Sequence, residues 1–215
     1  MSWPARIWLM LAILYAAFFN WYTSFGGPLS SEEIARYTQV LASMDAPPER
    51  LERWRHFMET DTGDDFAMLN AIDMRDEPTP GPGIEASDSS ADVLAKYTEP
   101  FLGRAFRSAA HPVFMGSAAA PALDLWGIEG ASEWDTGALV RYRSRRDLLE
   151  QVVAVRALEG TNIHSFKIAA IEKTIAFPVD PWFQLGDPRF VLGLVLAVIG
   201  LCFHLRDALA RVEPA

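Results

Sequence analysis

The chain has 215 residues, 50% of them hydrophobic, and a formal net charge of −9 at pH 7. This acidic balance excludes nucleic-acid binding through a basic surface, the usual source of affinity in such proteins. Cysteine occurs only at Cys202, which excludes an intrachain disulfide and a zinc site built mainly from cysteine ligands.

An apolar run near the N-terminus extends from Ile7 to Phe25. A helix of this length would cross roughly 28 Å, close to the thickness of a bilayer core. Aromatic residues typical of membrane interfaces stand near its ends. The alternative is a cleaved signal peptide, but bulky residues follow the run instead of a small-residue cleavage site. We therefore expect residues 1–25 to form an N-terminal transmembrane anchor.

A second apolar run covers residues 190–203, with no charge between Arg189 and Arg206. The alternative is a buried core helix, because the run is shorter than 18 residues. A core helix would usually show a polar face, and this one has none. The sequence therefore predicts a transmembrane helix at 187–206, where Gly193 and Gly200 permit close packing in a hairpin of two spans.

Basic residues predict the orientation of the two spans. Arg6 precedes the first span, and Arg206 and Arg211 follow the second. By the positive-inside rule, both termini lie in the cytoplasm and the central domain lies outside. In a bacterium this means the inner membrane, with a periplasmic domain.

The residues between the spans predict a helical lead-in at 26–61 and a folded domain at 62–181. The lead-in begins with a capping box formed by Ser30 and Glu33. A Pro/Gly/Ser-rich loop at 76–90 is predicted to be mobile. The predicted helices are 30–44, 49–60, 91–108, 145–158 and 162–173, and the predicted strands are 66–74, 111–115 with 123–126, 134–144 and 174–179.

The order strand, helix, strand, strand, helix, strand predicts an α+β fold of the ferredoxin-like βαββαβ type. Its helices would cover one face of a four-stranded antiparallel sheet. The other face, expected to carry Asn70 and Phe114, would need a cover, which a second copy could supply.

Three stretches resemble the dimeric α/β-barrel superfamily, in an uncharacterised membrane-anchored branch related in fold to the antibiotic-biosynthesis monooxygenases. These stretches are His111–Gly116, Trp134–Asp135 and Arg141–Asp147, and the resemblance covers roughly residues 63–180. It implies a homodimer with a cleft between sheet and helices in each subunit. It implies no single chemistry, because members include oxygenases, isomerases, haem enzymes and ligand-binding modules.

A basic cluster gives the first candidate site. Arg141 and Arg143 share one strand face and could capture an anion such as a carboxylate, with Asn70 as a further ligand-binding candidate. The alternative is that the arginines pair with nearby acidic residues, namely Asp135, Asp147 and Glu150.

The catalytic candidates are Tyr97, His111 and His164, since histidine is the commonest general base. A structural role for each is the alternative. No pair of histidines has metal-ligand spacing, so we expect no metal site.

Two functions remain in view. The first is a membrane-tethered ligand-binding or assembly module, with membrane lipid, a second copy and a membrane-protein partner as its contacts. The second is an oxygenase or isomerase that acts on a small substrate in the barrel cleft. No cofactor is predicted, although haem-dependent chemistry belongs to the second hypothesis.

Overall fold

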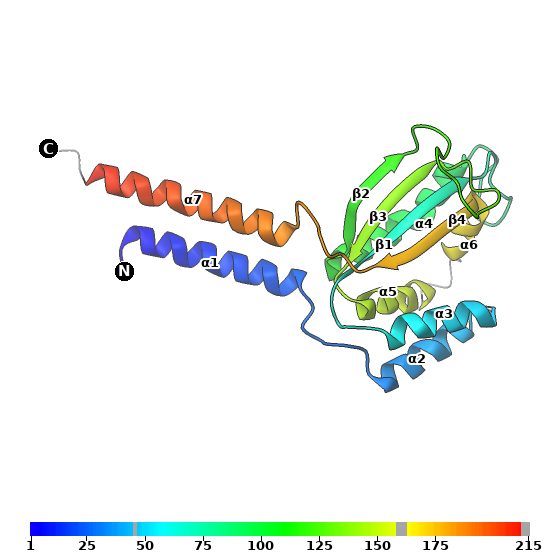
Figure 1. Cartoon of the computed structure of the whole chain (residues 1–215), viewed down its shortest axis with the longest axis horizontal. Helices are drawn as coiled ribbons and strands as arrows, with labels where there is room; N and C mark the ends of the chain where they lie inside the picture. The colour runs from blue at the N-terminus through cyan, green and yellow to red at the C-terminus, as the bar shows by residue number, and fades with distance from the viewer. Residues whose placement is uncertain (45–46, 158–162, 212–215) are drawn as a thin grey trace. The chain divides into compact units, whose positions relative to one another are not determined.

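The computed structural model describes residues 1–44, 47–157 and 163–211 (Figure 1). The chain divides into two compact units. We call residues 1–23 with the segment from Pro181 onward the apolar unit, and residues 24–180 the α+β unit.

The apolar unit consists of α1 (Trp3–Tyr22) and α7 (Pro188–Ala210), which run side by side (Figure 1). Each helix is long and apolar enough to cross a membrane. Helix α1 ends three residues before the predicted limit of 25, and α7 extends beyond the predicted limit of 206. Asp187 caps α7, because its side chain accepts a hydrogen bond from the Arg189 N–H.

The glycines of α7 lie where α1 approaches. A Cβ atom added at Gly200 would lie 2.6 Å from the Trp8 ring, and one added at Gly193 would lie 3.3 Å from the Tyr15 ring. The rings of Trp3 and Phe203 are 5.5 Å apart. These contacts make α1 and α7 an antiparallel pair and confirm that the two glycines permit close packing.

The α+β unit contains a four-stranded antiparallel sheet with the strand order β2-β3-β1-β4 (Figure 1). Its strands are β1 (Phe66–Met74), β2 (His111–Ser117), β3 (Thr136–Tyr142) and β4 (Ile171–Val179). The predicted α+β class is therefore confirmed.

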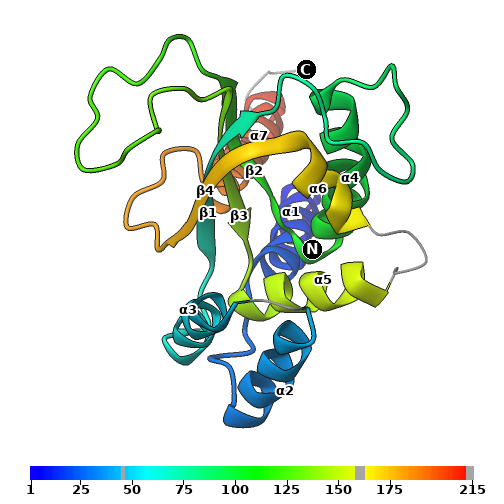
Figure 2. The same ribbon diagram turned by 90° about the vertical axis from the view of Figure 1, so that its right-hand side faces the viewer.

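The helices of this unit are α2 (Ser31–Ala42), α3 (Pro48–Glu59), α4 (Ser90–Ala105) with a 3₁₀ turn η1 (Phe106–Ser108), α5 (Arg145–Ala157) and α6 (Ile163–Ala170). Helices α4, α5 and α6 lie on one side of the sheet, and α2 and α3 lie beyond one end of its strands (Figure 2). The predicted capping box at Ser30 and Glu33 is present, and Ser89 and Asp92 form a second one at the start of α4.

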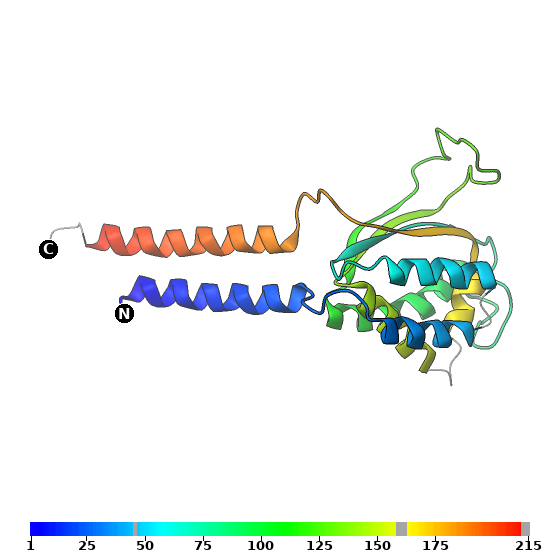
Figure 3. The same ribbon diagram turned by 60° about the horizontal axis from the view of Figure 1, so that its bottom comes forward.

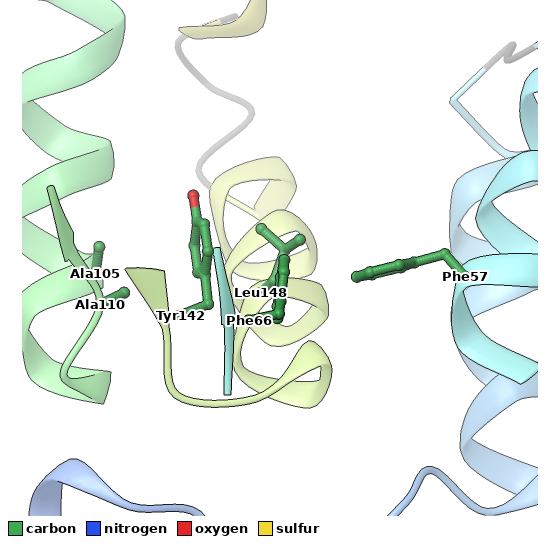
Figure 4. Packing of buried hydrophobic residues seen from close by; sticks show 6 residues of the cluster. All are labelled: Phe57, Phe66, Ala105, Ala110, Tyr142 and Leu148. Atoms are coloured by element: carbon green, nitrogen blue, oxygen red, sulfur yellow. The ribbon is translucent and has the colours of Figure 1, made fainter. Parts of the chain in front are cut away.

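Two of the clusters of buried side chains in the core adjoin each other. The first contains Phe57, Phe66, Ala105, Ala110, Tyr142 and Leu148 (Figure 4). The second contains Leu29, Tyr37, Leu41, Met58 and Leu149. Since the second cluster joins α2 and α3 to α5, the lead-in helices belong to the folded core (Figure 3).

Two segments differ from the sequence-based assignment. Residues 123–126 form no strand and lie in the long loop between β2 and β3, where Leu123 is 97% exposed. Ile171 and Lys173, predicted to end a helix, belong to β4, where they pair with Met74 and Asp73 of β1. Backbone pairing with an existing strand outweighs local helix propensity at this point.

Asn70 lies on the opposite face from the predicted one. Asn70 follows Met68 by two residues and Phe66 by four, so the three side chains point to the same face of β1. Phe66 and Met68 pack in the core, and Asn70 therefore belongs to the helix-covered face. The uncovered face carries Phe114, which is paired with Leu139 of β3. The error arose because strand alternation alone does not say which face the helices cover.

The loop at 76–90 has several points of attachment. Its Thr79 N–H donates to the Ala169 carbonyl at 3.0 Å, and Lys96 Nζ donates to the Gly83 carbonyl at 2.8 Å. Ile84 packs against the small cluster formed by Val93, Ala169 and Ala170. The loop therefore takes part in packing α4 against α6.

Candidate functional site

The predicted anion-binding arginines are engaged within the chain. Arg141 is 1% exposed, and its guanidinium donates to Asp65 Oδ2 at 3.0 Å and to the Ala109 carbonyl at 3.1 Å. Arg143 donates twice to the carboxylate of Asp147, at 2.8 Å each. The expected pairing with Asp147 is thus present, while the pairing of Arg141 with Asp65 was not predicted.

The next two arginines hold the chain connections of the α+β unit. Arg146 binds the Glu33 carboxylate at 2.6 Å and donates to the carbonyl of Gly27 at 3.2 Å. Arg145 Nη2 lies 3.6 Å from Asp180 Oδ2. The segments by which the chain enters and leaves this unit therefore both lie at the N-terminus of α5. The charge cluster was visible in the sequence, but its partners are remote in the chain.

The other two candidates, His111 and Asn70, lie on strands of the sheet. His111 lies on β2, directly opposite Arg141 in the sheet register, and its Nδ1 is 3.1 Å from the Pro112 carbonyl. Asn70 donates from Nδ2 to the Met68 carbonyl at 2.9 Å.

Helices α4 and α6 bring the remaining catalytic candidates together. The rings of Tyr97 and His164 meet edge to face with centroids 6.4 Å apart. Tyr97 also stacks on Phe101 at 5.6 Å, and Lys167 Nζ lies 5.7 Å from the centre of the Tyr97 ring. We call Tyr97, Phe101, His164 and Lys167 the α4–α6 cluster. Sequence reasoning did not bring Lys167 next to Tyr97.

The electrostatics of the α4–α6 cluster disfavour its charged forms. Burial lowers the pKa of Lys167, and the positive charge of Arg50 lowers it further. Burial also lowers the pKa of His164, assisted by Lys167 and Arg50. Burial raises the pKa of the Tyr97 hydroxyl. A negative group bound here would reverse the effect on both cations.

Two further polar side chains, Gln151 of α5 and Tyr142 of β3, contact or influence residues of the α4–α6 cluster. Gln151 of α5 is 4% exposed and donates from Nε2 to the Phe101 carbonyl at 2.7 Å. Among the described residues its Oε1 has no hydrogen-bond partner. The Tyr142 hydroxyl points away from Phe66 and Leu148 (Figure 4), and burial together with Tyr97 raises its pKa. A buried acceptor left unsatisfied costs about 1–3 kcal/mol.

An open groove of about 750 Å³ lies elsewhere, beside α3 and the end of β4. Its lining includes His56, Arg145 and Asp180. Arg145 already stacks on Phe57 at 4.6 Å and donates to Thr60 Oγ1 at 2.9 Å. Its charge is therefore used within the fold. Over the described parts of the chain, no group of three or more His, Cys, Asp or Glu side chains could hold a metal ion.

Comparisons with known proteins give distant structural similarity only. No known protein family and no curated protein matches the sequence. Two crystal structures of RPA0582, a protein of unknown function from Rhodopseudomonas palustris, are similar to the chain. The methylated form is 20% identical, with a TM-score of 0.49, and the match covers 66% of this chain and 96% of that one. The other is 19% identical, with a TM-score of 0.48, and covers 65% and 97%.

Proposed function

We propose that this protein is a membrane-tethered ligand-binding or assembly module of the bacterial inner membrane, with a periplasmic ferredoxin-like domain. The observation that carries the proposal is an α+β unit inserted between two helices long and apolar enough to span a bilayer. Both chain connections of that unit converge on Arg145 and Arg146. This convergence suits a domain held by two neighbouring anchors.

The strand order supports the ferredoxin-like assignment. In the split βαβ arrangement, the last strand lies beside the first, and the third separates the first from the second. The order β2-β3-β1-β4 has this property. It also agrees with the proposed relationship to the dimeric α/β-barrel superfamily.

The uncovered face of the sheet supports a homodimer. A row of apolar residues crosses all strands in register, through Phe114, Leu139, Leu69 and Phe177. Phe114 is 62% exposed and Phe177 is 45% exposed. Apolar surface left open over a whole sheet marks an interaction site, and a second copy would bury it. A membrane-protein partner is the alternative to a second copy as the cover of this face.

The membrane topology rests on charge and aromatic residues. Arg6 precedes α1 and Arg211 follows α7, which favours cytoplasmic termini. Trp3 and Trp21 lie at the ends of α1, where tryptophan suits the interface with lipid headgroups.

The second candidate function is a small-substrate oxygenase or isomerase. It is favoured by the α4–α6 cluster, where Tyr97 and His164 adjoin an amine whose pKa is lowered. A lowered pKa moves a lysine toward the range in which its amine can exchange a proton with a substrate. No cofactor is part of this proposal.

Site-directed labelling in cells tests the anchoring and the topology together. In a Cys202→Ala background, single cysteines are introduced at exposed Glu129 in the α+β unit and at Ser2 before α1. After only the outer membrane is permeabilised, a membrane-impermeant maleimide should label the cysteine of Glu129→Cys and spare that of Ser2→Cys. The reverse pattern would contradict the topology, and release of the protein by alkaline carbonate would contradict the anchoring.

A further inference from the structure

We propose that Lys167 is the cationic anchor of a binding site between α4 and α6 for a carboxylate ligand with an apolar body. The inference rests on the ligand-binding function proposed above and names its ligand class.

The lysines of this chain provide an internal comparison. Lysine occurs at positions 96, 167 and 173. Lys96 Nζ lies 2.5 Å from Asp88, and Lys173 Nζ lies 3.1 Å from Asp73. Lys167 is partly buried as well, yet over the described residues no carboxylate lies within ion-pair distance of it. The exception is notable in a chain where 28 acidic residues face 19 lysines and arginines.

The surroundings of Lys167 make its positive charge unfavourable unless an anion is bound. Burying an ammonium group without a compensating charge is unfavourable. The charge of Arg50 adds repulsion, and the nearby His164 supplies a group that becomes positive on protonation. A carboxylate at Lys167 would compensate all three, which is the pattern expected of an anion site.

Aromatic rings define the rest of the ligand. The stacked Tyr97 and Phe101 rings form an apolar wall on α4, and the His164 ring meets Tyr97 edge to face. Lys167 Nζ lies over the Tyr97 ring at 5.7 Å. A carboxylate on the ammonium would therefore place an attached apolar group next to this wall.

Gln151 gives an independent sign of an incompletely satisfied site. Its buried Oε1 accepts no hydrogen bond from the described residues, while its Nε2 donates to the backbone carbonyl of Phe101 at 2.7 Å. Buried polar groups without partners are rare in folded proteins.

The test uses the full-length protein in detergent micelles, with its lysines converted to ¹³C-dimethyl-lysine. The three lysine NMR signals are assigned with single Lys→Arg variants. Benzoate, acetate and neutral benzamide are then titrated separately. We expect benzoate to shift the Lys167 signal saturably at about tenfold lower concentration than acetate, and benzamide to leave it unchanged. The Lys96 and Lys173 signals should not saturate.

Matched variants separate a site from general ion binding. Lys167→Gln should weaken benzoate binding measured by calorimetry about tenfold or more, and Lys173→Gln should leave it unchanged. Parallel, unsaturable shifts of all lysines with benzoate, or no shift of Lys167, would overturn the carboxylate site. Native mass spectrometry of the same sample distinguishes failure of the carboxylate site from failure of the proposed ligand-binding function. A bound neutral molecule with an unmoved Lys167 signal would overturn this inference and leave the ligand-binding function standing.

Discussion

The Glu33–Arg146 pair shows how one side chain can join the lead-in to the core. Arg146 belongs to α5, and Glu33 lies in the first turn of α2. Hydrogen bonds from Arg146 and from the Ser30 backbone lower the pKa of Glu33 from 4.5 to about 2. A depressed carboxyl pKa stabilises the fold above the unfolded-state pKa, and that stability is lost as pH falls toward the folded-state value.

We predict that Glu33→Gln lowers the free energy of unfolding at pH 7 by about 1–3 kcal/mol. Glutamine keeps the capping geometry but loses the charge that Arg146 binds. The deficit should shrink as pH falls from 4.5 toward 2, because Glu33 in the wild type becomes protonated there. Urea titrations in micelles at several pH values measure it, with exposed Glu32→Gln as the control. A deficit independent of pH would contradict this explanation.

At this scale, sequence reasoning succeeded where the partners are local. Arg143 and Asp147 are four residues apart, and their ion pair was among the alternatives considered. The partner of Arg141 is Asp65, which lies 76 residues away and becomes a neighbour only through the β1–β3 register. The approach of Lys167 to Tyr97 likewise depends on α4 packing against α6, which side-chain periodicity does not specify.

At the scale of elements, the strands and helices with strong patterns were predicted well. Strand β1 spans the residues predicted for it, 66–74. The failures lie where tertiary pairing decides the outcome. The start of β4 is fixed by its ladder with β1. Residues 123–126 read as a strand, but in the structure they project on an exposed loop without a neighbouring strand (Figure 3).

The packing of α1 on α7 gives a prediction for these two elements. Gly200→Ala should lower the unfolding temperature of the apolar unit more than Gly193→Ala. The added Cβ would lie 2.6 Å from the Trp8 ring at position 200, but 3.3 Å from the Tyr15 ring at position 193. Thermal unfolding in micelles, followed by tryptophan fluorescence, compares the two variants. Equal effects of both substitutions would contradict the tighter contact at Gly200.

At the scale of the whole molecule, the uncovered sheet face accounts for the proposed dimer. Its apolar residues come from every strand, and those on β2 and β4 are among the most exposed large side chains of the sheet. The sequence predicted that one face would need a cover, although it placed Asn70 there in error. Which residues form that face follows from the strand register.

We predict that Phe177→Glu converts a dimer to a monomer. A charge in the middle of a buried apolar interface would remain unpaired and strongly disfavour association. Ile168→Glu is the matched control, because Ile168 is 63% exposed but belongs to α6. Analytical ultracentrifugation in detergent should give dimers for the wild type and the control. A monomeric wild type would contradict the proposed interface.

The most direct test of the account is native mass spectrometry of the full-length protein, released from membranes in mild detergent. We expect a homodimer that carries a reproducible small additional mass. That mass should persist in Lys173→Gln and disappear in Lys167→Gln. A bare monomer, with neither a second copy nor a bound molecule or partner chain, would contradict the central claim of a membrane-tethered ligand-binding or assembly module.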